Sequence, residues 1–177
     1  GGSSTNDAAI DDISVFNSVP SNGQAPLPGL ASMDINGATN SGGFQVSSGS
    51  NGIYSATIQV GGNITFDFEG ELSQAVILLN GPSNEALISL PPVGQFDIGT
   101  GIGGGGIPTG LALVADGTQP TFPDFFFRTG SSGSAAITFT VPLLPLGVLT
   151  TFQAVFFTPS TGTVVKISNA VEVTVTP

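Results

Sequence analysis

The sequence of 177 residues contains no cysteine, no histidine and no tryptophan, and its only cations are Arg128 and Lys166. Without Cys or His, no Ser-His-Asp or Cys-His catalytic arrangement can form, and zinc and haem lose their usual ligands. The absence of Cys also means that no disulfide constrains the fold and no thiol is open to oxidation, which suits a secreted protein. We therefore expect a protein that is not an enzyme and that is extracellular or on the cell surface.

Positive charge is almost as scarce, since 12 acidic residues face 2 basic ones and the net charge is −10. Nucleic acids and anionic lipids bind clustered Lys and Arg, so neither is an expected partner. No apolar run approaches the roughly 20 residues that span a bilayer, so membrane insertion is not expected. The first five residues, GGSST, have neither the basic region nor the apolar stretch of a signal peptide, and we expect an already processed chain.

Short apolar segments with a period of two dominate the chain, separated by many of its 26 glycines and 13 prolines. Residues 63–70 place Ile64, Phe66 and Phe68 on one face, and residues 171–175 alternate in the same way. The full set of predicted strands is 10–16, 30–35, 44–47, 54–60, 63–70, 75–79, 86–90, 111–115, 125–127, 134–141, 149–157, 164–167 and 171–175. Helical patterns are nearly absent.

Some of these segments carry further expectations. The runs 75–79 and 125–127 are apolar without alternation, which predicts strands covered on both faces. In 134–141 we expect Ile137, Phe139 and Val141 to point inward. Residues 91–108 are expected to form a long surface loop. Its glycine run 99–106 is not a phosphate cradle, because no Lys-Ser/Thr pair follows it and no helix is predicted there.

About a dozen short strands in a chain of this length predict one all-β domain. We expect an Ig-like or jelly-roll-like β-sandwich over residues 21–177, preceded by a segment at 1–20 that is an N-terminal arm or a first strand.

Residues 60–176 contain a series of motifs that belong together. They are VGGNITF at 60–66, LLNGP at 78–82, the strand at 134–141 ending before Pro142, TFQAVF at 151–156 and SNAVEVT at 168–174. This part of the chain resembles the Ig-like β-sandwich modules found near the C-termini of large secreted bacterial surface proteins. The resemblance implies a fold and a location, and it carries no active-site residue.

Two alternatives are open for the N-terminal segment. Ile10, Ile13, Val15 and Phe16 either form a donor strand that completes the sheet of a neighbouring copy, or they form the first strand of their own sandwich. Apolar residues Phe125, Phe126 and Phe127, with Phe122, form a second expected contact patch. The leading hypothesis is a homopolymer: a structural subunit of an extracellular filament, pilus-like fibre or surface layer.

The runner-up is an adhesive or carbohydrate-binding cell-surface module, with glycans as partners. A hydrolase that uses Asp67 and Glu69, which share one strand face, ranks below both, because carboxylates on a half-exposed strand more often serve solubility and edge protection. The chain lacks Trp and has one Tyr, Tyr54, which also weakens a sugar-binding site.

No cofactor is expected, although calcium is the one common metal that this composition permits. The candidate ligands, against a background of solvated acids, are Asp7, Asp11, Asp12, Asp116 and Asp124. No Asp-x-Asp-x-Asp-Gly loop occurs among them. Asn63-Ile64-Thr65 matches a glycosylation acceptor, but its position on a strand makes a chance match the better explanation.

Overall fold

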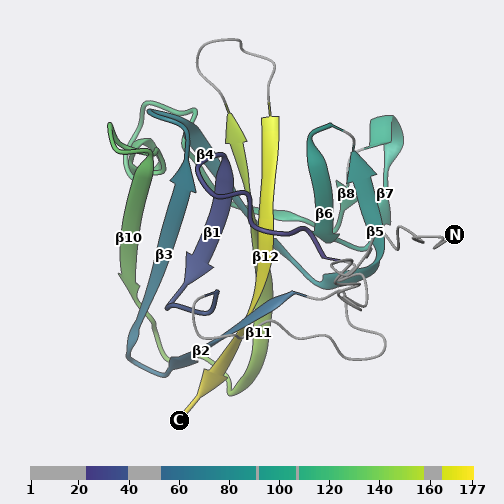
Figure 1. Ribbon diagram of the computed structural model, residues 1–177. Helices are drawn as coiled ribbons and strands as arrows, with labels where there is room; N and C mark the ends of the chain where they lie inside the picture. The colour runs from purple at the N-terminus through teal and green to yellow at the C-terminus, as the bar shows by residue number, and fades with distance from the viewer. Residues whose placement is uncertain (1–22, 40–52, 91, 107, 158–164) are drawn as a thin grey trace, which may run out of the picture.

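The computed structural model describes residues 23–39, 53–90, 92–106, 108–157 and 165–177. It is an all-β sandwich, as predicted, and its described helical elements are two single 3-10 turns (Figure 1). The first sheet has three antiparallel strands in the order β1-β3-β10. Their bounds are Ala31–Ile35 for β1, Asn63–Gly70 for β3 and Ser134–Thr140 for β10.

The second sheet has five strands in the order β2-β12-β11-β4-β9. These are β2 (Tyr54–Gln59), β4 (Ala75–Gly81), β9 (Ala112–Asp116), β11 (Gly147–Phe157) and β12 (Val165–Thr176). All neighbours are antiparallel except β2, which runs parallel to β12. The segments predicted separately at 164–167 and 171–175 are thus one continuous strand that bends at an irregularity in its pairing with β11.

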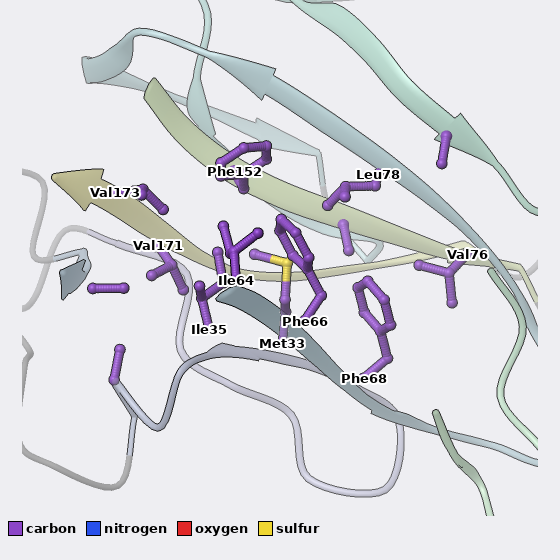
Figure 2. Packing of buried hydrophobic residues seen from close by; sticks show 14 of the residues in the cluster. Met33, Ile35, Ile64, Phe66, Phe68, Val76, Leu78, Phe152, Val171 and Val173 are labelled. Atoms are coloured by element: carbon purple, nitrogen blue, oxygen red, sulfur yellow. The ribbon is translucent and has the colours of Figure 1, made fainter. Parts of the chain in front are cut away.

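The main core fills the space between these two sheets (Figure 2). The alternation predicted in β3 is confirmed: Phe66 and Phe68 point inward and are buried. Phe66 meets Phe152 of β11 edge to face at 5.1 Å, and Phe68 meets Phe156 at 6.2 Å between ring centroids. Aromatic residues from facing strands therefore join the two layers.

A third layer covers the outer face of the five-stranded sheet. It consists of β5 (Ser83–Leu90) paired with β6 (Gly94–Ile98), and β7 (Gly101–Ile102) paired with β8 (Pro108–Thr109), with the turn η1 (Gly104–Gly106) between the last two. Phe96 and Ile98 of β6 pack in a second apolar cluster with Val155 and Ile167. The prediction of a surface loop over 91–108 was therefore wrong. A five-residue strand that includes Gly94 and a buried Asp carries too short an apolar pattern to be recognised.

Strand β4 lies between the two apolar clusters, which confirms the prediction that it is covered on both faces. Val76 and Leu78 belong to the main core, whereas Ile77 and Leu79 pack against the second cluster. The continuous apolar run suits this position because side chains on both faces of the strand pack against apolar neighbours.

Buried polar side chains connect the layers. Gln153 of β11 is fully buried; its Oε1 accepts from Asp97 N–H at 2.9 Å, and its Nε2 donates to Gln95 O at 2.9 Å and Ser168 O at 2.8 Å. Ser168 Oγ in turn accepts from Ala154 N–H at 3.0 Å, where the pairing of β11 with β12 is irregular. One glutamine thus satisfies backbone groups from β6 and β12, which would otherwise be buried without partners.

Candidate functional site

The sandwich is closed along one flank, where β1 lies against β12. Asn169 Oδ1 accepts from Met33 N–H at 3.1 Å, and Asn169 Nδ2 donates to Met33 O at 2.8 Å. On the same edge of β1, Leu27 and Ala31 exchange two backbone hydrogen bonds of 3.1 and 2.8 Å. The outward backbone groups of Ala31 and Met33 therefore have partners, and this stretch of the edge is not available to another strand.

The opposite flank is open. Strand β10 pairs only with β3 among the described strands. Val141 N–H donates to Gly62 O at 2.8 Å. In this register, the backbone N–H and C=O groups of the odd-numbered residues of β10 point toward β3. The backbone groups of Ala136, Thr138 and Thr140 consequently point away from the sheet. Figure 1 shows β10 as the outermost strand of its sheet, far from the third layer.

An apolar groove runs along this open flank, between β10 and the β9 edge of the other sheet. It consists of two adjoining depressions of about 290 and 460 Å³ that share Pro123, Phe127 and Phe139. Buried Phe66 and Phe152 line the first depression, so the groove reaches the main core. The charged residues that line it lie apart: Asp124 in the first depression and Arg128 in the second.

Edge position explains why the inward face of β10 is less buried than predicted. Val141 is buried, but Ile137 is only half-buried and Phe139 is 40% exposed. Phe139 stacks with Phe127 at 6.2 Å and meets Phe66 at 6.2 Å, so it points toward the core as expected. Its exposure arises because no described strand covers it on the open side.

The segment predicted as a strand at 125–127 is instead part of the 3-10 turn η2 (Asp124–Phe126). Phe126 N–H donates to Pro123 O at 3.1 Å and Phe127 N–H to Asp124 O at 2.9 Å, so the turn follows directly from a Pro-Asp sequence that favours it. With this local pairing the ring of Phe127 points away from the other two. Phe127 enters the core, while Phe125 and Phe126 are 41% and 51% exposed.

Phe125 and Phe126 form a small aromatic cluster with Phe122, which is 79% exposed. The ring centroids of Phe125 and Phe126 lie 3.9 Å apart, and Phe122 meets Phe126 edge to face at 5.9 Å. Leu143, Leu146 and Val148, in or beside the connection that leads from β10 to β11, are also largely exposed. Large exposed apolar side chains therefore gather beside the groove, which marks the flank as a contact surface.

A second feature is acidic and lies on the outer face of the three-stranded sheet. Asp67 and Glu69 share this face, as predicted, and Asp34 of β1 is the direct cross-strand partner of Asp67, which sequence alone did not reveal. They line a depression of about 440 Å³. Partial burial raises the pKa of Asp67, and the carboxylates of Asp34 and Glu69 raise it further.

The depression has few of the parts that a sugar site uses. Its two large apolar lining residues, Met33 and Phe68, are buried core side chains, and Tyr54 lies on another strand. Asp34 already accepts hydrogen bonds from Gly37 N–H and Thr39 N–H, both at 2.6 Å. Across the described residues, no group of three or more acids is arranged to hold a metal ion.

The other predicted site residues are dispersed. Asp116 accepts hydrogen bonds from Thr118 N–H at 3.0 Å and Thr118 Oγ1 at 2.6 Å, which lowers its pKa. Asp124 lies on η2, and Asn63 is exposed at the start of β3. The remaining predicted residues lie outside the described part of the chain: Asp7, Ile10, Asp11, Asp12, Ile13, Val15 and Phe16.

The start of the described chain is hydrogen-bonded to a buried carboxylate. Asp97 of β6 is fully buried, and it accepts from Gln24 N–H at 2.6 Å and from Gln95 Nε2 at 2.8 Å. Gln24 Oε1 accepts from Gln95 N–H at 3.0 Å. Burial raises the pKa of Asp97 to about 6, although both hydrogen bonds act in the opposite direction.

No protein-family model matches this sequence, and no curated protein matches it. Among the described residues, no helix has the length and hydropathy needed to cross a bilayer.

Proposed function

We propose that this protein is a structural subunit of an extracellular filament, pilus-like fibre or surface layer, in which copies assemble by strand addition and apolar contacts. The observation that carries the proposal is the open flank: an edge of β10 that pairs with no other described strand, an apolar groove beside it and exposed aromatic rings around it. A protein that works as a monomer normally protects such an edge with charge, proline or a covering segment.

The composition agrees with dense packing between copies. The chain has 8% charged residues, so a contact between two such surfaces buries few ions and carries little of the desolvation cost of buried charge. The extracellular location rests on the absence of Cys and on the resemblance of residues 60–176 to modules of secreted bacterial surface proteins.

The test compares two exposed apolar residues on different flanks. Phe126 is 51% exposed beside the groove, and Ile102 is 64% exposed in the third layer. We expect electron microscopy and sedimentation of the wild type to show regular polymers. We also expect Phe126→Asp to raise the concentration needed for assembly at least about tenfold and Ile102→Asp to leave it unchanged. A wild type that stays monomeric at high concentration would refute the proposal.

An adhesive or glycan-binding module is the second candidate, and the depression lined by Asp34, Asp67 and Glu69 is where it would bind its ligand. It predicts a monomer whose binding to a glycan array is lost in Asp67→Asn. Assembly without glycan binding would leave the structural subunit as the better account.

A further inference from the structure

The groove on the open flank could accommodate one additional β-strand. It lies between two sheet edges, β10 and β9, and it is floored by core aromatics. An inserted strand has backbone groups to pair with on β10 at Ala136, Thr138 and Thr140, and apolar surface to cover at Phe139. The occupant that fits is therefore an extended segment with alternate apolar side chains.

The N-terminal segment of this chain has that composition. Ile13 and Val15 alternate with Ser14, and Phe16 follows. Residues 1–22 precede the described chain, and a stretch of 22 residues spans up to about 70 Å when extended, enough to reach well beyond its own domain.

The described chain begins at the third layer, on the flank away from the groove. Gln24 is fastened to β6 in the third layer through Asp97 and Gln95. Figure 1 shows that layer on the flank opposite β10. A segment that leaves one flank and a groove that opens on the other are the two halves of a head-to-tail contact, which repeats into an open polymer when it does not close into a ring.

Charge sets the direction of the strand. The acids of the segment, Asp11 and Asp12, lie on the N-terminal side of Ile13. In the groove, Arg128 lies toward the start of β10, and Asp124 lines the depression toward its end. A segment that runs parallel to β10 places its acids near Arg128, which attracts them. An antiparallel segment would place them near Asp124, which repels them.

We propose that residues 8–19 of one copy insert as a strand, parallel to β10, into the groove between β10 and β9 of the next copy. This inference rests on the proposed function and specifies its contact. Ile13 and Val15 face the groove, and Ser14 lies on the solvent side next to Thr138.

The absence of native cysteine makes a crosslinking test specific. The double variant Ser14→Cys with Thr138→Cys is oxidised after assembly and separated on denaturing gels. We expect a ladder of covalent oligomers that collapses on reduction. The control, Ser14→Cys with Ile102→Cys, places the second thiol in the third layer and should give no ladder.

Direction is tested with a second pair of variants. Asp12→Cys should crosslink to Ala136→Cys in a parallel arrangement and to Thr140→Cys in an antiparallel one. Crosslinking to position 140 alone would overturn the proposed direction.

A second experiment needs no cysteine variants, because it adds the N-terminal segment as a separate peptide. A protein lacking residues 1–19 should not polymerise and should bind a synthetic peptide of residues 8–19. The same peptide carrying Ile13→Asp and Val15→Asp should bind at least about tenfold more weakly, because two buried apolar contacts are lost.

The outcomes separate this inference from the proposed function. Polymers that form without a crosslink to β10, or that persist without residues 1–19, would keep the structural subunit and reject the strand insertion. A compact monomer in which the thiols introduced at positions 14 and 138 join within one chain would show that each copy fills its own groove. Soluble monomers throughout would reject both.

Discussion

Asn169 holds both backbone groups of Met33, accepting from its N–H at 3.1 Å and donating to its carbonyl oxygen at 2.8 Å. The side-chain amide thus takes the place of a neighbouring strand at the edge of β1. It joins the two sheets along one flank, while the flank at β10 has no corresponding group among the described residues.

Replacing Asn169 by leucine should leave both Met33 groups buried without partners. Because each unsatisfied buried group costs about 1–3 kcal/mol, we expect Asn169→Leu to lower the free energy of unfolding by about 2–5 kcal/mol in urea titrations. The control Asn63→Ala, at an exposed position of β3, should change it by less than about 0.5 kcal/mol. Equal effects of the two would mean that the amide does not hold the flank.

Gln153 gives a related prediction for the contact between the main sheet and the third layer. Gln153→Met keeps the volume but leaves Asp97 N–H and the carbonyls of Gln95 and Ser168 without this partner. We expect a loss of at least about 3 kcal/mol of unfolding free energy. The same change at exposed Gln59 should be nearly neutral, and a neutral result at Gln153 would show that water replaces the amide.

Asp97 should make stability depend on pH. Its pKa is about 6 in the folded protein against an ordinary value of 3.8. Between these values the folded state keeps a proton that the unfolded state has released, so the free energy of unfolding falls as pH rises from about 4 to 6. The total change is on the order of 3 kcal/mol.

Asp97→Asn should remove that dependence, because an amide side chain still accepts from Gln24 N–H and carries no charge. The measurement is urea unfolding of both proteins from pH 4 to 7.5, with the difference between them isolating Asp97. Asp116→Asn serves as a control of opposite sign, since hydrogen bonds from Thr118 lower the pKa of Asp116. Parallel curves for wild type and Asp97→Asn would contradict the prediction.

Gly117 lies where the turn after β9 packs against β4. A Cβ at this position would overlap Phe127 O and lie 2.8 Å from Val76 O, both backbone atoms that cannot move independently. We expect Gly117→Ala to lower the free energy of unfolding by about 2–4 kcal/mol in urea titrations. Gly104→Ala is the matched control, since a Cβ there meets nothing within 4 Å, and a neutral Gly117→Ala would show that the turn adjusts.

Much of the sandwich was predictable from short-range pattern. The alternation in β3 and in residues 171–175 of β12 reports which face meets the core, because side chains on a strand point to opposite sides in turn. The apolar run in β4 predicted burial on both faces for the same reason. The strand predicted at Phe125–Phe127 was wrong, because the preceding Pro-Asp sequence favours the hydrogen bonds of a local turn over those of a strand.

The candidate site was only partly visible in the sequence. Phe125 and Phe126 were selected for their apolar character, and their exposure depends on η2, which turns Phe127 into the core and the other two rings outward. Phe139 carried no such signal, since its pattern is that of any inward strand residue. It is exposed because β10 is an edge strand.

By itself, the sequence determined the class of fold and a narrow set of excluded arrangements: without Cys and His there is no Ser-His-Asp or Cys-His constellation and no thiolate or imidazole metal ligand, and the two-residue period specifies β-strands. Only the tertiary structure decided which strands stand at the edges, which flank Asn169 closes and which flank no described strand covers. Strand order depends on pairing between residues far apart in the chain. Local alternation records which face of a strand is buried, and it contains no information about which neighbour lies beside it.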